Sequence, residues 1–154
     1  MPKIKIKNIE STCLKADALK EVIVKFYSSE KDLEIVFDKR IKDSYGWYFY
    51  DEARHVNLIR VSPLLHQFHD CDVRKPITAE TQKYTYISTI LHELRHAQQR
   101  DEWGKSFYSK EYCRNKNLID SYAAYHFTEI EIDACIYELQ HVLEAVKIYN
   151  SCET

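Results

Sequence analysis

Five consecutive residues, HELRH at 92–96, carry the clearest chemical signal in the sequence. On a helix, residues four positions apart lie one above the other, so His92 and His96 can direct imidazole nitrogens at a single Zn²⁺ ion. Glu93 projects to one side of this pair, where a carboxylate can take a proton from a metal-activated water without becoming a ligand. The spacing therefore predicts zinc-dependent hydrolysis with Glu93 as the general base.

The residues around the motif indicate how the two histidines are oriented. At about 100° per residue, the apolar side chains of this helix share one side with Gln98, whereas His92 and His96 lie on roughly the opposite side. The apolar set comprises Ile87, Ile90, Leu91 and Leu94. We therefore expect the histidines to line a cleft, while the other side of the helix anchors it in the core.

A catalytic zinc site needs a third protein ligand, and the segment TEIEIDA at 128–134 offers three carboxylates. Glu129 and Asp133 lie four apart at the edge of the predicted buried side of a helix, whereas Glu131 falls on the outward side. A carboxylate against an apolar face is costly unless it binds a metal or a partner. We therefore choose Glu129 as the third ligand and Asp133 as the acceptor of a ligand histidine's ring N–H, with Glu131 as the alternative. The apolar positions that define the buried side are Ile132, Cys135, Ile136, Leu139, Leu143 and Val146.

The two motifs together resemble those of the gluzincin metallopeptidases, in which HExxH is followed downstream by a helix that carries ExxxD. Here the pattern stands as HELRH at 92–96 and EIEID at 129–133, and the resemblance covers roughly residues 78–145. The chain looks most similar to small single-domain zincins of regulatory, mobile-element or phage type. Ile132 departs from the family, which usually has a small residue there. The resemblance implies zinc ligation by His92, His96 and Glu129, general-base catalysis by Glu93, and orientation of a histidine by Asp133.

Three polar residues shortly before Glu129 could donate a hydrogen bond to the oxyanion of a tetrahedral intermediate, as tyrosine and histidine do in related enzymes. They are Tyr122, Tyr125 and His126, and His126 is the first to test. The segment HQFHDC, which contains His66 and His69, is too sparse in ligands to predict a second metal site, so we expect these histidines at the surface.

Composition sets the class of protein. The 154 residues suit one domain, 1–154, and 45% hydrophobic residues predict a globular core. Twenty-two basic and 24 acidic residues are spread along the chain, so we expect no dedicated nucleic-acid or membrane surface. Five cysteines without a CxxC pair, together with the lack of a leader or an apolar span, predict a reduced, cytoplasmic protein whose partner is a protein or peptide substrate.

The remaining elements must position the motif. An amphipathic helix over 11–27 is expected to cover a sheet made of three β-rich runs, connected as an antiparallel meander. Thr78 as N-cap and Gly104 as terminator bound the long helix that carries HELRH. The pattern predicts an α+β fold of minimal zincin type with a small, mostly antiparallel sheet. If the run 55–62 forms the edge of this sheet, it could pair with an extended substrate, and if the run 46–51 is the edge, that role passes to it. The three runs are 33–38, 46–51 and 55–62, and helical periodicity returns over 118–149.

Two other functions fit the same motif. A regulatory factor that binds one host protein could retain the scaffold and the zinc without useful turnover. A structural zinc is the third possibility, and it would need a fourth protein ligand, for which His126 is the nearest candidate. Only the catalytic site keeps a coordination position for water.

Overall fold

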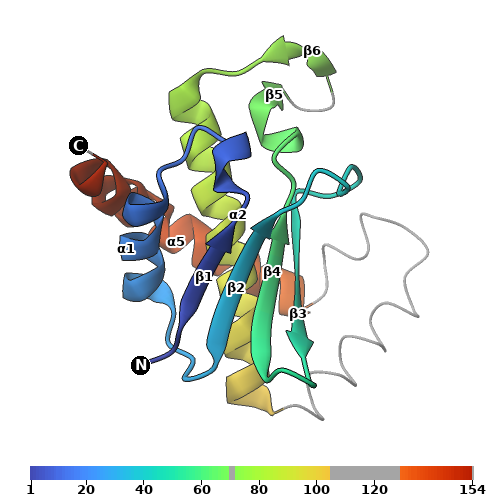
Figure 1. The fold of residues 1–154 in the computed structure, drawn as a ribbon, viewed down its shortest axis with the longest axis vertical. Coiled ribbons are helices and arrows are strands. Elements are labelled where there is room, and N and C mark those ends of the chain that lie inside the picture. The colour runs from blue at the N-terminus through green and yellow to red at the C-terminus, as the bar shows by residue number, and fades with distance from the viewer. Residues whose placement is uncertain (70–71, 105–128, 154) are drawn as a thin grey trace.

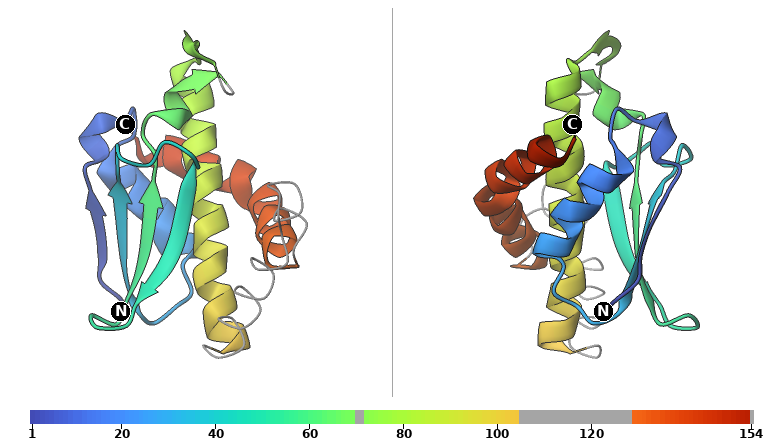
Figure 2. Two further views of the ribbon diagram at one scale, coloured as in Figure 1. Left: turned by 90° about the vertical axis from the view of Figure 1, so that its right-hand side faces the viewer. Right: turned by 60° about the vertical axis from the view of Figure 1, so that its left-hand side comes forward.

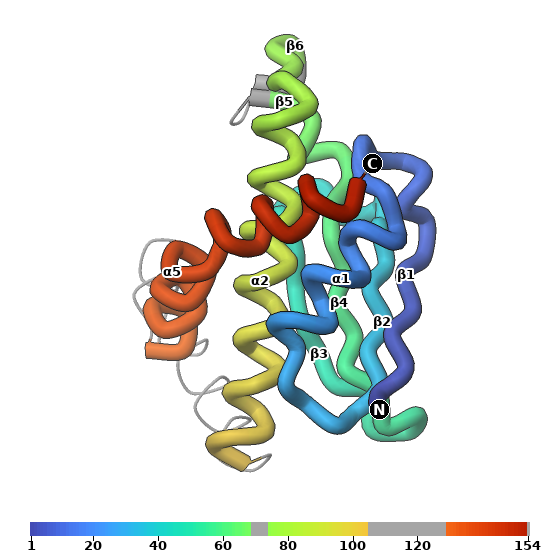
Figure 3. The backbone as a smooth tube through the Cα atoms, turned by 90° about the vertical axis from the view of Figure 1, so that its left-hand side faces the viewer, coloured from blue at the N-terminus to red at the C-terminus, as the bar shows by residue number. Residues whose placement is uncertain are grey.

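The computed structural model describes residues 1–69, 72–104 and 129–153, and these form an α+β fold. Helices α1 and α2 cover one face of a four-stranded sheet, and α5 crosses the side of these helices that faces away from the sheet (Figures 1, 2 and 3). None of the described helices is long and apolar enough to cross a membrane. In chain order the elements are β1 (Ile4–Lys7), α1 (Ala16–Phe26), β2 (Asp32–Phe37), β3 (Gly46–Asp51), β4 (Val56–Val61), β5 (Phe68–His69), β6 (Asp72–Pro76), α2 (Ala79–Trp103) and α5 (Glu129–Cys152), with short 3₁₀ turns at Ile9–Ser11 and Leu65–Gln67.

The sheet is mixed, with the strand order β1-β2-β4-β3. In this sheet β2 is parallel to both β1 and β4, and β3 is antiparallel to β4; β5 and β6 form a separate antiparallel pair. The expected meander is therefore wrong, because β3 lies outside β4 instead of between β2 and β4. Strand β1 was not predicted, although Ile4 and Ile6 alternate with lysines as a strand requires. These corrections place β3, rather than the run 55–62, at an edge of the sheet.

The core lies between the sheet and the two helices that cover it. Residues Leu33, Ile35 and Phe37 of β2 alternate with outward-facing residues and are buried against the helices together with Ile59 and Val61 of β4. The apolar side of α1 packs on the same core, as its spacing predicted. Its buried residues are Ala18, Leu19, Val22, Ile23 and Phe26.

Helix α2 is the longest element and has the predicted ends. The N–H of Thr81 donates to the Thr78 hydroxyl at 3.2 Å, which satisfies an amide of the first turn, and Gly104 ends the helix with a positive φ of 79°. The expected apolar side of α2 is buried in the core. It comprises Ile87, Ile90, Leu91 and Leu94, and Gln98 is buried on the same side.

Helix α5 packs with a different side from the one predicted. Four of the aliphatic residues expected in the core are exposed, with an exposed fraction of 74% for Leu139, whereas Val146 of the same predicted set is buried as expected. The side that contacts α2 and α1 also carries small, acidic and aromatic residues. The exposed residues are Ile132, Ile136, Leu139 and Leu143, and the buried ones are Ile130, Glu131, Ala134, Ala145, Val146 and Tyr149.

Strand β3 and helix α2 lie close together at Gly46. A Cβ atom at this position would lie 2.8 Å from the Cγ2 atom of Thr89 and 3.1 Å from the carbonyl oxygen of Arg60. It would also lie 3.5 Å from a carboxylate oxygen of Glu93. A side chain cannot be added here without a shift of the strand or the helix, so Gly46 sets the distance between β3 and the HELRH segment.

We expect the substitution Gly46→Ala to destabilise the protein by about 1–3 kcal/mol, the usual cost of overpacking. The loss should be smaller in a Thr89→Ser background, because serine lacks the Cγ2 atom that the new methyl group would strike. Urea unfolding of the two single variants, the double variant and the wild type measures this coupling. An equal loss in both backgrounds would show that the contact with Thr89 does not set the spacing.

Candidate metal centre

The two histidines of HELRH face α5. They lie four residues apart on α2, and their rings are nearly perpendicular, with centroids 4.8 Å apart and an interplanar angle of 81°. His96 is buried and His92 is only slightly exposed. The histidines therefore line an interface between two helices, rather than the open cleft that the helix phase predicted.

Glu131, in the first turn of α5, lies between the two imidazole rings. One of its carboxylate oxygens is 3.0 Å from Nε2 of His92, and the other is 3.0 Å from Nε2 of His96. The carboxylate is buried, and the three donor groups lie within 4.8 Å of one another. Two imidazole nitrogens and one carboxylate oxygen form the ligand set that zinc enzymes commonly use, so these residues fit a zinc ion.

Glu129, our choice for the third ligand, does not lie beside the histidines. Its side chain is exposed, because residues 129 and 131 are about 200° apart around a helix and α5 buries the side that contains residue 131. The expectation failed because it took the large aliphatic residues of α5 as the buried side. The structure thus reverses the order of the two carboxylates and makes Glu131 the candidate ligand.

Gln99 orients the ring of His96. Its side-chain nitrogen donates to Asp133 at 2.7 Å and to the carbonyl oxygen of Ile130 at 2.9 Å, so its amide oxygen is the atom that faces Nδ1 of His96 at 2.8 Å. Nδ1 must then carry the ring proton, which leaves the lone pair of Nε2 for a metal. Asp133 acts one step further away than we expected, because it holds Gln99 and Arg95 rather than the histidine.

Glu138 has the corresponding place beside His92. One carboxylate oxygen lies 3.2 Å from Nδ1 of His92, and the other accepts a hydrogen bond from the Ser88 hydroxyl. The thiol of Cys135 lies 4.0 Å from the same ring nitrogen. Glu138 was not predicted, although residues 131, 135 and 138 have the i, i+4, i+7 spacing of one helix side.

Charges in this cluster compensate one another. Burial would lower the pKa of His92, but hydrogen bonds to Cys135, Glu131 and Glu138 outweigh it and raise that pKa. Burial would raise the pKa of Glu131, but hydrogen bonds from His92 and His96 outweigh it and lower that pKa. The cluster therefore favours a positive charge between the carboxylates. A metal cation can supply that charge when the imidazoles are deprotonated.

Glu93 lies on a different side of α2, toward β3. Its side chain is buried, and burial raises its pKa above the ordinary value against the opposing effect of His96 and His92. Among the described residues, none donates a hydrogen bond to this carboxylate. A carboxylate with a raised pKa near two imidazoles can both accept and return a proton.

A cavity of about 360 Å³ lies beside the cluster, between α2, α5 and Tyr45, which immediately precedes β3. Ser88 and Thr89 form part of its wall. The Ser88 hydroxyl donates to Glu138, and Thr89 lies next to Gly46. Its other lining residues, Tyr45, Tyr84, Thr85 and Val142, are mostly apolar on the side that faces the space. The cavity has room for an amino-acid side chain next to the candidate centre.

His66 supports one wall of this cavity and is fully buried, which corrects the expected surface position. Its Nδ1–H donates to the carbonyl oxygen of Ser62, so its Nε2 accepts from the Thr89 hydroxyl at 2.8 Å. The ring stacks on Tyr86 with centroids 4.4 Å apart. His66 thus fixes the rotamer of a residue one turn before Glu93.

The remaining predicted site residues, Tyr122, Tyr125 and His126, lie outside the described residues, so their assignment as oxyanion donors stays a prediction. Comparisons with protein-family models, with curated proteins and with solved structures found no match for this chain.

We expect Glu131→Ala to weaken zinc binding by more than about 100-fold, the upper limit for the loss of residues that only support a ligand. The matched control, Glu129→Ala, should bind zinc as tightly as the wild type, because its carboxylate is exposed and remote from the imidazoles. Competition with a chromophoric chelator at pH 7 measures both affinities. The opposite order would return the third-ligand role to Glu129.

The buried His66 should make the stability depend on pH. Burial lowers the pKa of His66 to about 4 from an ordinary value of 6.5, so the unfolded chain binds more protons between these values. The stability linked to this residue is complete above pH 6.5 and is lost as the pH falls toward 4. From pH 7 to pH 5 the loss should be about 2 kcal/mol.

Urea unfolding in the presence of a chelator at pH 7 and pH 5 tests this expectation. In His66→Gln, whose amide can replace both hydrogen bonds but takes up no proton, the decrease between the two pH values should be smaller by about 2 kcal/mol. Equal decreases in the two proteins would mean that His66 takes up its proton without destabilising the fold.

Proposed function

We propose that this protein is a zinc-dependent peptide hydrolase. The observation that carries the proposal is the placement of Glu131 between His92 and His96, with the two Nε2 atoms each 3.0 Å from one of its oxygens. Both Nδ1 atoms have a partner, Glu138 for His92 and Gln99 for His96, so both rings present Nε2 to the same point.

Each residue has a distinct part in the proposed reaction. His92, His96 and Glu131 hold the zinc, which when bound supplies a water whose pKa falls toward about 7. Glu93 accepts a proton from the attacking water and then transfers that proton to the amine nitrogen that leaves. Its burial excludes bulk water from this exchange, and its raised pKa suits the return of the proton.

The sheet edge supports a peptide as the substrate. Strand β3 is at the edge of the sheet and packs beside α2, with Gly46 next to Glu93 (Figure 2). An extended peptide can add to such an edge through main-chain hydrogen bonds. We transfer the proposed substrate strand from the run 55–62 to β3 for this reason, and assign the cavity beside Ser88 and Thr89 to a substrate side chain.

The alternative functions differ from hydrolysis in the number of ligands and in turnover. A structural zinc needs four protein ligands. Among the described residues two groups could hold a metal, and each offers three ligands: His92, His96 and Glu131 in one, and His92, Cys135 and Glu138 in the other. A regulatory factor without turnover would keep these ligands but would not need the buried carboxylate of Glu93. The substitution of Glu93 therefore separates the proposals.

We expect Glu93→Gln to bind one zinc ion per chain and to cleave peptides at least about 100-fold more slowly than the wild type, because the amide cannot accept the proton. Incubation with a mixed peptide library and mass spectrometry of the products measures cleavage, with Glu129→Gln as a control that removes an exposed carboxylate. Undiminished cleavage by Glu93→Gln would remove Glu93 from the mechanism. A zinc-containing wild type that cleaves no peptide would favour the regulatory alternative.

A further inference from the structure

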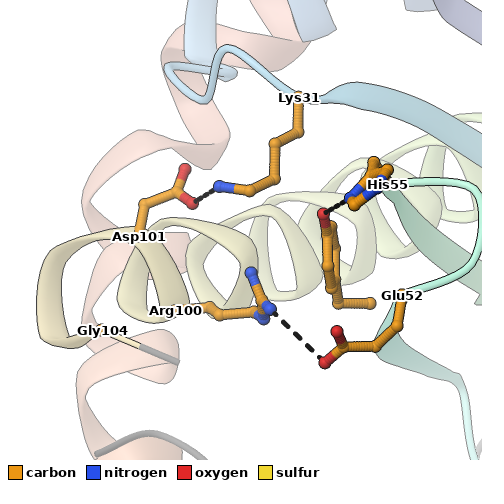
Figure 4. A pocket seen from close by; sticks show the side chains of 7 residues that line it. Lys31, Glu52, His55, Arg100, Asp101 and Gly104 are labelled. Atoms are coloured by element: carbon orange, nitrogen blue, oxygen red, sulfur yellow. Dashed lines mark hydrogen bonds and ion pairs between the residues drawn. The ribbon is translucent and has the colours of Figure 1, made fainter. Parts of the chain in front are cut away.

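A second cavity, of about 390 Å³, lies at the end of α2 away from the first one (Figure 4). Tyr50 of β3 forms one wall, and Lys31 just before β2, residues of the turn after β3 and the C-terminal end of α2 complete it. Unlike the cavity beside Ser88, this one is lined by charged groups. They are Lys31, Glu52, Arg100 and Asp101, with His55 beside them.

Arg100 is the central residue of this cavity. Its side chain is only 9% exposed, and its guanidinium lies 3.6 Å from the centre of the Tyr50 ring. The nearest described carboxylate is that of Glu52, whose oxygen is 3.9 Å from Nη2, too far for a hydrogen bond. A guanidinium has five N–H donors, and among the described residues none accepts a hydrogen bond from Arg100.

Most of the other polar groups of the cavity pair with one another rather than with Arg100. Lys31 and Asp101 neutralise each other through an ion pair at 2.5 Å, and the Tyr50 hydroxyl is 3.2 Å from Nδ1 of His55. Glu52 is 58% exposed, so water screens its charge. Within the described part of the chain, the buried cation of Arg100 is matched by no carboxylate nearer than this exposed one.

This arrangement favours a planar anion as the ligand. A carboxylate can accept two parallel N–H bonds from one guanidinium, and such charge-assisted pairs are stronger than neutral hydrogen bonds. The Tyr50 ring holds the guanidinium plane in place, which reduces the entropy that binding would cost. Figure 4 shows the guanidinium of Arg100 directed toward Glu52 across the space.

The position of Arg100 relates the cavity to Glu93. The two residues are seven positions apart on α2 and therefore lie on the same side of the helix, about 10 Å apart along its axis. Strand β3 runs beside both, since Gly46 adjoins Glu93 and Tyr50 stacks on Arg100. An extended peptide advances about 3.3 Å per residue, so it would span this distance with about three residues.

We propose that this cavity is an anionic subsite, in which Arg100 binds a carboxylate of the substrate peptide about three residues from the bond that is cleaved. The proposal rests on the proposed function and adds a substrate class, peptides with a carboxylate at this distance. The carboxylate is that of an Asp or Glu side chain or that of the peptide's C-terminus. Glu52 partly occupies the approach to Arg100 and competes with this group.

The test measures binding separately from cleavage. Fluorescent octapeptides carry Asp or Asn at each position in turn, with a free or an amidated C-terminus, and their affinity for zinc-containing Glu93→Gln protein is measured by anisotropy. We expect at least one acidic peptide to bind about 10-fold or more tightly than its amide counterpart, as charge-assisted hydrogen bonds allow. The position of the acid, or a requirement for the free C-terminus, distinguishes the two sources of the carboxylate.

Substitutions at the cavity then assign the preference to Arg100. Adding Arg100→Gln should abolish the difference in affinity between the acidic peptide and its amide counterpart. Arg100→Lys should leave a smaller difference in affinity, because lysine keeps the charge but not the paired donors. Glu52→Gln should strengthen the binding of acidic peptides by removing a competing carboxylate. A purely structural role of Arg100 would not produce this effect. Arg40→Gln, which removes an exposed arginine that pairs with Asp38, controls for net charge.

The outcomes separate this proposal from the proposed function. If the wild type cleaves peptides but no acidic peptide is preferred, or if the preference survives Arg100→Gln, the subsite is wrong and the hydrolase proposal stands. If the preference follows Arg100 while the wild type cleaves nothing, the cavity is an anion site and the hydrolase proposal fails. The melting temperature and zinc content of each variant identify any that does not fold. If the Arg100 variants do not fold, the affinity of Glu52→Gln for acidic peptides alone decides whether the subsite exists.

Discussion

A buried carboxylate between two imidazole rings fixes how α5 sits on α2. Glu131 is removed from water, and His92 and His96 compensate its charge, which would be costly to bury without partners. The first turn of α5 must therefore be placed with the accuracy of a hydrogen bond. Gln99, which bonds both the Ile130 carbonyl and Asp133, and Arg95, which also bonds Asp133, hold that turn against α2.

The rest of the fold provides a rigid support for this contact. Helix α2 is anchored by Ile87, Ile90, Leu91 and Leu94 in the core that the sheet and α1 form, so the two histidines project from a helix that cannot rotate. The C-terminal half of α5 adds Val146 and Tyr149 to the same core, and the Tyr149 hydroxyl accepts a hydrogen bond from the backbone N–H of Lys15. Apolar packing thus fixes the position of both helices, and the polar contacts between them fix their register.

Local sequence signals predicted the elements whose burial follows hydrophobicity. The ends of α2, its apolar side and the buried residues of α1 could be read from caps and spacing, because these helices bury aliphatic residues. Helix α5 does not follow this rule, since the side that holds Glu131, Ala134 and Glu138 faces α2 while Leu139 and Leu143 are exposed. Periodicity cannot distinguish such a side from a solvated one. The order of strands was also beyond local sequence, because the pairing of β2 with β4 joins residues on either side of β3.

The sides of α2 divide the proposed chemistry. His92 and His96 turn toward α5, whereas Glu93 and Arg100 turn toward β3, where Gly46 and Tyr50 meet them. The ligands therefore need burial between helices, while the proposed base and anion site need an approach for a peptide along the sheet edge. Because Glu93 follows His92 directly, both requirements act on one turn of the helix. The close contact at Gly46 keeps β3 near enough to shield Glu93 from bulk water, which helps to raise its pKa.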